Sequence, residues 1–179
     1  MYGKDITMQK RYDIILDLIR DIKNPVGVEV GVWKGDTTFN LLNNKHDLIL
    51  YCVDPYIQFK GDDDLSKFDD EYMDNLYNNV YNKLINNYKN GIMCRMSSEE
   101  ASIKFKNENK QFDFVFIDGN HLDVEQDIEY WLPLLKDDGI LIGHDYRHHK
   151  LGEYVKNVVD RRFGGKINIS FDNTWWVYK

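Results

Sequence analysis

The stretch VGVEVGVWKGDTTFNLL, from Val26 to Leu42, decides the fold of this 179-residue chain. A short apolar run leads to an acidic residue, Glu29, and two glycines, Gly31 and Gly35, follow before an apolar segment at helical spacing. Glycine lets the backbone approach a ligand closely, and a helix that begins just after it points free N–H groups towards that ligand. The stretch therefore predicts a strand, a ligand-binding turn and a helix.

The rest of the chain alternates between short apolar runs and segments with apolar residues at helical spacing. The apolar runs predict strands at 26–30, 48–56, 91–96, 112–119 and 139–146. The helical spacing predicts helices at 7–22, 37–44, 69–88, 97–105, 122–135 and 151–163. The last stretch, KINISFDNTWWVYK (166–179), predicts two strands joined by a turn at Asp172 and Asn173.

This alternation is typical of a doubly wound α/β fold. We expect a Rossmann-like, mostly parallel sheet of seven strands with helices on both faces, because continuous apolar runs suit parallel strands that are covered on both sides. The closing strand–turn–strand adds an antiparallel last strand. We expect a single domain over residues 1–179, in which the acidic segment and helix at 57–88 form a lid or insert over the site.

Composition and charge narrow the range of functions. The chain has 23 basic and 30 acidic residues and a net charge of −7 at pH 7, which argues against a broad phosphate-binding face and a nucleic-acid partner. Its start lacks the apolar core of a signal peptide, and no apolar run approaches the roughly 20 residues of a membrane span. Cys52 and Cys94 lie in apolar runs and are expected to be buried thiols. We therefore expect a cytoplasmic protein.

Polar side chains lie at the carboxyl ends of four of the predicted strands. Ligands of open α/β sheets bind beyond the carboxyl ends of the strands, and several polar groups that converge on one edge indicate a site. Any one of them alone could simply cap a helix or end a strand. The candidates are Glu29 with Gly31, Asp54, Asp118 with His121, and His144 with Asp145.

The spacing of the first turn bears on the kind of ligand. It is E-x-G-x-x-x-G rather than the G-x-G-x-x-G of dinucleotide binders, and the bulky Val32 and Trp33 lie within it. The turn thus provides less room for a pyrophosphate. A carboxylate at Asp54 can accept hydrogen bonds from ribose hydroxyls, which fits NAD or a nucleoside such as S-adenosylmethionine.

Five segments together resemble a known family. VEVGVWKGDTT, YCVDPY, CRMSSEEA, FDFVFIDGNH and GILIGHDY occur in the order and spacing of the class I S-adenosylmethionine-dependent methyltransferases. The segment from FIDGNH to GHDY resembles more particularly the macrocin-type group of small-molecule O-methyltransferases. The resemblance covers nearly the whole chain from about residue 25.

The resemblance implies a role for each matching residue in binding S-adenosylmethionine. Glu29 and Gly31 would line the methionine and ribose side, and Asp54 would hold the ribose hydroxyls. Met96 and Ser97 would flank the adenine. Asp118 would lie near the methionine amine or bind a metal. The implied cofactor-binding set is Glu29, Gly31, Gly35, Thr37, Asp54, Met96, Ser97 and Asp118.

The resemblance also implies catalytic and metal-binding residues. In metal-dependent relatives a D-G-x-H segment supplies a metal-binding aspartate and a histidine base, here Asp118 and His121. A pair after the fifth strand, usually two acidic residues, completes the metal site; here it is His144 and Asp145. Because Mg²⁺ prefers oxygen ligands and histidine favours softer metals, three cases stay open. Asp118 and Asp145 bind Mg²⁺ with water, another divalent ion is bound, or there is no metal.

Taken together, the sequence predicts a methyltransferase that uses S-adenosylmethionine to methylate an oxygen of a small, sugar-like or polyhydroxylated acceptor. Divalent-metal assistance and a homodimer are left open. His144 in place of an acidic residue keeps a second hypothesis open, a catalytically degenerate nucleoside-binding or scaffold protein. A third is an NAD-dependent oxidoreductase, although the dinucleotide fingerprint and a second, substrate-binding domain are absent from the sequence pattern.

Overall fold

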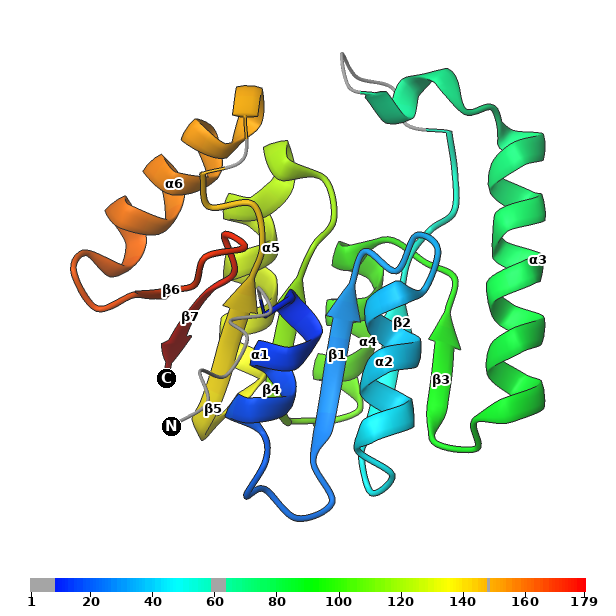
Figure 1. Cartoon of the computed structure of the whole chain (residues 1–179), viewed down its shortest axis with the longest axis horizontal. Coiled ribbons are helices and arrows are strands. Elements are labelled where there is room, and N and C mark those ends of the chain that lie inside the picture. Colours follow the sequence, from blue (N-terminus) through cyan, green and yellow to red (C-terminus); the bar gives the residue numbers. More distant parts are fainter. Residues whose placement is uncertain (1–8, 59–63, 148) are drawn as a thin grey trace, which may run out of the picture.

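The computed structural model describes residues 9–58, 64–147 and 149–179. Within them, seven strands form one sheet in the order β3-β2-β1-β4-β5-β7-β6, and the sheet forms the middle layer of the molecule (Figure 1). The strands are β1 (Val26–Val30), β2 (Ile49–Val53), β3 (Gly91–Cys94), β4 (Phe112–Ile117), β5 (Leu135–Gly143), β6 (Asn168–Ile169) and β7 (Trp175–Tyr178).

The strand directions confirm the expected fold class. Neighbouring strands from β3 to β5 all pair in parallel, whereas β7 pairs antiparallel with both β5 and β6. Gly143 faces Trp175 across the β5–β7 pair. A Cβ at Gly143 would lie 2.3 Å from Cζ2 of Trp175, so the missing side chain is what lets the indole lie against the sheet.

The helices alternate with the strands along the chain. They are α1 (Arg11–Leu18), α2 (Asp36–Asn44), α3 (Asp70–Asn87), α4 (Ser98–Asn107), α5 (Val124–Trp131) and α6 (His149–Phe163), with short 3-10 turns η1 (Asp64–Lys67), η2 (His121–Asp123) and η3 (Leu132–Leu134). None of the helices in the described ranges is both long enough and apolar enough to cross a membrane.

Helices cover both faces of the sheet, and each face carries its own core. One core joins α4, α5 and α6 to strand residues such as Val28 and Val115. The other joins α1, α2 and α3 to Leu50, Phe114 and Phe116. In Figure 1, α1 and α2 lie in front of the sheet and α4 and α5 lie behind it. Alternate residues of β4 thus face opposite cores, and both sides of this central strand are apolar.

Several predicted boundaries differ from the observed ones. The helix predicted at 122–135 ends at Trp131, and Pro133 lies in the 3-10 turn that follows, because proline offers no N–H to continue a helix. The next strand then begins at Leu135, four residues before the predicted position. The first helix is also shorter than predicted. It ends at Leu18, and residues 7 and 8 of its predicted span lie outside the described residues.

The predicted lid at 57–88 is described in part. Residues 59–63, which include most of its acidic run, lie outside the described residues. Beyond them η1 leads into α3, where the Asp69 side chain accepts a hydrogen bond from the backbone N–H of Tyr72 and caps the helix. Farther along the chain, His148 lies outside the described residues and His149 begins α6.

Candidate functional site

A cleft of about 1020 Å³ lies at the carboxyl edge of the sheet. Its wall is built from residues that directly follow β1, β2, β4 and β5, together with the start of α4 and one side of α5. The parallel strands all point their carboxyl ends to this edge, so residues far apart in the sequence meet there. The sequence-predicted residues that line the cleft are Glu29, Gly31, Thr37, Asp54, Ser97, Asp118, His121, His144 and Asp145.

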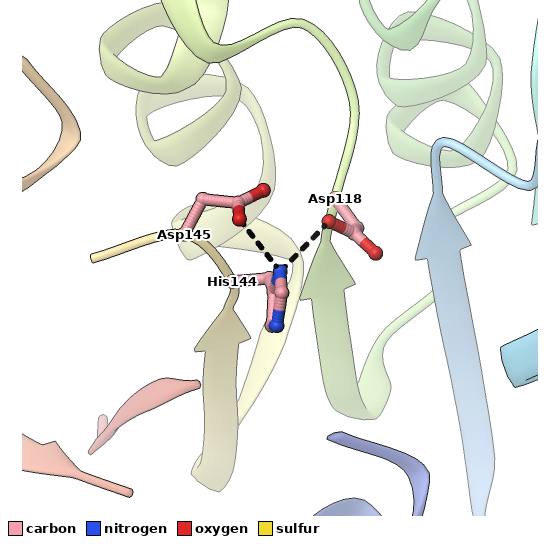
Figure 2. Close-up of side chains that lie close together, drawn as sticks. All are labelled: Asp118, His144 and Asp145. Atoms are coloured by element: carbon pink, nitrogen blue, oxygen red, sulfur yellow. Dashed lines mark ion pairs between the residues drawn. The ribbon is translucent and has the colours of Figure 1, made fainter. Parts of the chain in front are cut away.

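Three of these residues form a tight cluster after β4 and β5. One ligand atom from each of Asp118, His144 and Asp145 lies within 4.8 Å of the other two. Figure 2 shows the imidazole of His144 directed at both carboxylates. Its Nδ1 lies 3.0 Å from Oδ1 of Asp145 and 3.6 Å from Oδ1 of Asp118. The imidazole therefore bridges the two acidic groups.

The two carboxyl groups of the cluster differ in their proton affinity. Burial raises the pKa of Asp118 to about 6, although the neighbouring His144 and Arg11 counteract it. Burial also works against ionised Asp145, but hydrogen bonds from His121 and His144 outweigh it and lower the pKa of that carboxyl. For His144, burial is outweighed by its hydrogen bond to Asp145 and by the charge of Asp118, so its pKa is raised.

His121 and Asp145 form a hydrogen-bonded pair at the same end of the cleft. Nε2 of His121 lies 2.7 Å from Oδ2 of Asp145. The side chain of His121 retains a quarter of its accessible surface, and the residue begins the turn that leads into α5. Asp145 thereby fixes the orientation of a histidine that borders the cleft.

Arg11, which the sequence analysis did not single out, brings a positive charge into this acidic cleft. Its Nε lies 3.2 Å from Oδ2 of Asp118 and donates to Oγ1 of Thr37 at 2.9 Å. The residue begins α1, outside any motif that the sequence displays. Only the packing of α1 against α2 reveals that it reaches the cleft.

The carboxylate of Asp54 holds the turn that follows β1. It accepts backbone N–H groups of Val32 and Trp33 at 3.0 and 2.9 Å on one oxygen, and of Tyr56 at 2.8 Å on the other. The Tyr56 hydroxyl in turn donates to the carbonyl of Trp33. Since a carboxylate accepts about four hydrogen bonds, Asp54 keeps room for a further donor, and its contact with the ribose hydroxyls stays a prediction.

Glu29 is almost fully buried, with 1 % of its surface exposed. It accepts a short hydrogen bond from the Thr38 hydroxyl. Burial raises the pKa of Glu29 to about 8, with Thr38 lowering it in part and the nearby Asp118 raising it. The side chain therefore carries a proton over much of the neutral range and presents less negative charge to the cleft than the sequence implied.

Residues of α4 and α5 also line the cleft. Ser97 caps α4 by accepting the N–H of Glu100 at 3.2 Å. The hydroxyl of Ser98 donates a short hydrogen bond to Asp127, and Nε1 of Trp131 donates to Ser98 at 2.8 Å. Asp127 was missed in the sequence, but it shares the inner face of α5 with Trp131. An acidic residue on an apolar helix face is a signal that could have found it.

Two predicted cofactor-binding residues do not line the cleft. Gly35 lies behind the turn with a positive φ of 77°, and a Cβ there would lie 2.6 Å from the ring of Phe39. The missing side chain of Gly35 therefore lets the Phe39 ring, one turn into α2, lie against the start of its own helix. Met96 packs instead against the core beneath α4 and α5.

Strained backbone marks the cleft edge. Trp33, Tyr56 and Asp145 adopt φ values of 50°, 48° and 59°, and they follow β1, β2 and β5 respectively. Residues other than glycine and asparagine rarely adopt this left-handed backbone conformation. These positions are also held by hydrogen bonds, which Asp54 accepts from Trp33 and Tyr56 and which join Asp145 to His121. Such a concentration of strained backbone is typical of a functional site.

The comparison with protein families gives one match. The family described as "Methyltransferase domain" matches residues 28–146, which begin within β1 and end directly after His144 and Asp145. No curated protein matches the chain.

Solved structures show the same fold at low sequence identity. A candidate caffeoyl-CoA O-methyltransferase from Staphylococcus aureus has a TM-score of 0.68 and 16% identity over 96% of this chain and 84% of its own. The O-methyltransferase TomG from Streptomyces achromogenes, solved with S-adenosylmethionine, has a TM-score of 0.67 and 11% identity over 94% and 79%.

A third structure has a different printed activity. The precorrin-8w decarboxylase from Methanobacterium thermoautotrophicum has a TM-score of 0.63 and 15% identity over 99% of this chain and 96% of its own. At these identities the likeness shows the fold alone, and the activity has to be argued from the residues of the cleft.

Proposed function

The chain belongs to the methyltransferase domain family, and from that premise we propose that it transfers the methyl group of S-adenosylmethionine to an oxygen of a small, polyhydroxylated acceptor. The observation that carries the proposal is the arrangement of the cleft. The glycine turn after β1 opens into the same space as Asp118, His121, His144 and Asp145. A binding turn and a set of acid–base groups thus share one cavity.

Bound S-adenosylmethionine would supply a methyl group on a sulfonium, which is already an activated leaving group. The protein then has to hold the cofactor, position the acceptor and remove a proton. We assign cofactor contacts to Gly31, Thr37, Asp54 and Ser97, all of which line the cleft. Glu29 supports the turn from below through Thr38.

We assign proton removal to His121. An imidazole has a pKa suited to general-base catalysis near neutral pH, and Asp145 holds this ring through Nε2 at 2.7 Å. For Nε2 to take the proton, it has to exchange the Asp145 oxygen for the acceptor hydroxyl. Asp118 lies next to this pair and would orient the acceptor or the amine of the cofactor.

The cluster of Asp118, His144 and Asp145 fits a divalent cation. Its three ligand atoms lie within 4.8 Å of one another, close to the roughly 4–5 Å that separates opposite ligands of one cation. Two carboxylates and one imidazole suit Mn²⁺, Fe²⁺ or Zn²⁺ better than Mg²⁺. Such a cation would lower the pKa of an acceptor hydroxyl. Arg11 lies 3.2 Å from Asp118. A bound cation would therefore share the Asp118 carboxylate with the Arg11 guanidinium.

The acceptor side of the cleft faces the segment 57–88, which we propose as a lid. Ile57, Gln58 and Met73 from this segment line the cleft beside Trp33. The Trp33 ring also packs against Phe68 at 5.3 Å and Tyr72 at 6.2 Å between ring centroids. An aromatic wall with polar groups opposite suits a hydroxylated ring, the kind of acceptor that the resemblance to the macrocin-type group implies.

Titration calorimetry tests the proposal. S-adenosylhomocysteine is expected to bind with a dissociation constant in the micromolar range, about −8 kcal/mol, and NAD is expected not to bind. Repeating the titration with Mn²⁺ and Mg²⁺ tests the metal cluster, where tighter binding with Mn²⁺ is expected and an Asp145→Asn variant should lose the gain. Binding of NAD alone would favour an oxidoreductase instead, and binding of neither would favour a degenerate scaffold.

A further inference from the structure

The carboxyl group of Asp127 is the most deeply buried charged group of the cleft that the proposed mechanism does not use. Only 3 % of its surface is exposed, yet it lines the cleft. Oδ1 accepts the Ser98 hydroxyl. Among residues 9–58, 64–147 and 149–179, the Ser98 hydroxyl is the hydrogen-bond donor to this carboxyl group, and it contacts Oδ1 rather than Oδ2.

The hydrogen bonds behind Asp127 make its carboxyl group an acceptor. An indole nitrogen can only donate, so Ser98 accepts from Trp131 at 2.8 Å. The Ser98 proton is then directed to Asp127, which accepts it. Burial raises the pKa of Asp127 to about 7, so its ionised form is available at neutral pH, and a donor on a ligand favours that form.

The space above Oδ2 is left open by a glycine. A Cβ built on Gly119 would lie 4.0 Å from Oδ2 of Asp127, so the absence of a side chain at Gly119 leaves room beside this oxygen. Gly119 directly follows Asp118, and Ser98 begins α4. The acceptor oxygen therefore lies between the start of α4 and the end of β4, beside the reacting cluster rather than within it.

We propose that Asp127 is the residue that selects the purine of the bound nucleoside, by accepting a hydrogen bond on Oδ2 from a 6-amino group. This inference rests on the proposed function, since it needs a nucleoside cofactor in the cleft. A purine with a 6-amino group offers a donor at that edge, whereas a 6-oxo purine offers an acceptor. Two facing acceptors repel, and a buried acceptor without a donor loses affinity.

The test compares three homocysteine nucleosides by calorimetry on the full chain. They carry an amino group, a hydrogen or an oxygen at C6 of the purine. Wild-type protein is expected to bind the 6-amino ligand at least tenfold more tightly than either of the others. Asp127→Asn, which can turn its NH₂ group to the cleft, is expected to lower the 6-amino to 6-oxo preference at least tenfold.

A matched variant separates selection of the purine from a general effect of charge or of packing. Asp123→Asn removes the same charge one turn earlier, also at the cleft, and should leave the preference unchanged. If Asp127 only joined α4 to α5, its replacement would change all three affinities by the same factor. An equal shift of that kind would overturn the inference, and so would an unchanged preference in Asp127→Asn.

The wild-type titration alone decides if Asp127→Asn does not fold. Equal affinity of wild type for the 6-amino and 6-hydrogen ligands overturns the inference while leaving the methyltransferase proposal intact. Binding of none of the three ligands rejects the proposed function itself, and the inference with it.

Discussion

At the scale of single residues, Glu29 shows how a group at the cleft can serve the fold. Its carboxyl is buried beneath the turn after β1 and held by Thr38, with Asp118, Arg11 and Asp54 nearby. Because burial raises its pKa to about 8, the folded protein keeps a proton that the unfolded chain releases above about pH 4.5. Folding is thus linked to protonation at this position.

The sign of this linkage gives a prediction for Glu29→Gln. A raised pKa in the folded state means that the stabilising contribution is lost as pH rises from about 4.5 to 8. The variant, which stays neutral, should gain stability over wild type by an amount on the order of 3 kcal/mol between pH 5 and pH 8. Urea unfolding at both pH values measures it. The exposed Glu129→Gln is the control, and an equal change in both variants would contradict the prediction.

Gly31 lies so close to the backbone of Asp118 that a side chain at this position is expected to clash with it. Its φ is +89°, and a Cβ would lie 2.3 Å from the carbonyl oxygen of Asp118. Gly31→Ala should therefore lower the free energy of unfolding by about 2–4 kcal/mol and weaken binding of S-adenosylhomocysteine. Gly164→Ala shares the positive φ but has open space around it, so it should cost only about 1 kcal/mol. Equal losses would show that crowding against β4 is not the cause.

His121 carries the prediction about turnover. His121→Ala should lower kcat at least tenfold, the smaller part of what a general base contributes, and leave the affinity for S-adenosylhomocysteine nearly unchanged. Turnover is measured on an acceptor that supports methyl transfer. His46→Ala removes an exposed imidazole far from the cleft and is the control. An unchanged kcat in His121→Ala would reject its role as base.

The residues at the strand ends could be predicted from the sequence because parallel strands bring their carboxyl ends to one edge. This reasoning brought Asp118, His121, His144 and Asp145 together, as the structure does. It does not reveal which partner each side chain chooses. Asp54 binds backbone N–H groups, and Arg11 reaches the cleft through helix packing, neither of which leaves a spacing in the sequence.

At the scale of secondary-structure elements, β7 depends on one large side chain. Trp175 is fully buried, lies over Gly143 and packs against Phe163 of α6 at 6.2 Å between ring centroids. A single residue thus joins the antiparallel strand to both the sheet and its covering helix.

We expect Trp175→Ala to destabilise the protein by about 3–5 kcal/mol, the usual cost of deleting a buried large aromatic side chain. Tyr178→Ala on the same strand removes a side chain that is 62 % exposed and should cost less than about 1 kcal/mol. Chemical denaturation of both variants measures the two losses. A similar small loss in each would mean that β7 is held by its backbone hydrogen bonds alone.

Element boundaries were predicted less well than element types. The apolar periodicity placed all the strands and helices in the right order, yet β5 begins four residues early and α5 ends early at Trp131. Periodicity reports which face is buried, and a 3-10 turn with Pro133 keeps that face without remaining an α-helix. The extra residues of β5 pair only with the first residue of β4, across an irregular register.

At the scale of the whole molecule, ligand binding and folding are coupled. A ligand that binds only the folded chain stabilises it by about 2.7 kcal/mol at a hundredfold excess over its dissociation constant. S-adenosylhomocysteine at that concentration should therefore raise Tm by about 5–10 °C for a chain of this size. Thermal unfolding measures the shift, and NAD at the same concentration is the control. An equal shift with NAD would contradict the proposed cofactor.

The layered architecture was predictable because alternating strands and helices have few other ways to bury their apolar faces. The position of each strand in the sheet was not, since β1 lies beside both β2 and β4 although only β2 follows it closely. The sequence pattern alone does not tell which of the later apolar strands pairs with the second edge of β1.

The pairing of β1 with β4 has a consequence for how the protein is made. Val28 pairs with Val115, so one edge of β1 has no partner until the ribosome has released the second half of the chain. A nascent chain that ends before β4 exposes backbone groups that can capture another strand. Such distant pairings also slow folding, because the chain loses the entropy of closing a long loop before the new contacts stabilise it. Strand β4, which brings Asp118 and His121 to the cleft, is thus also the strand whose synthesis gives β1 its second partner.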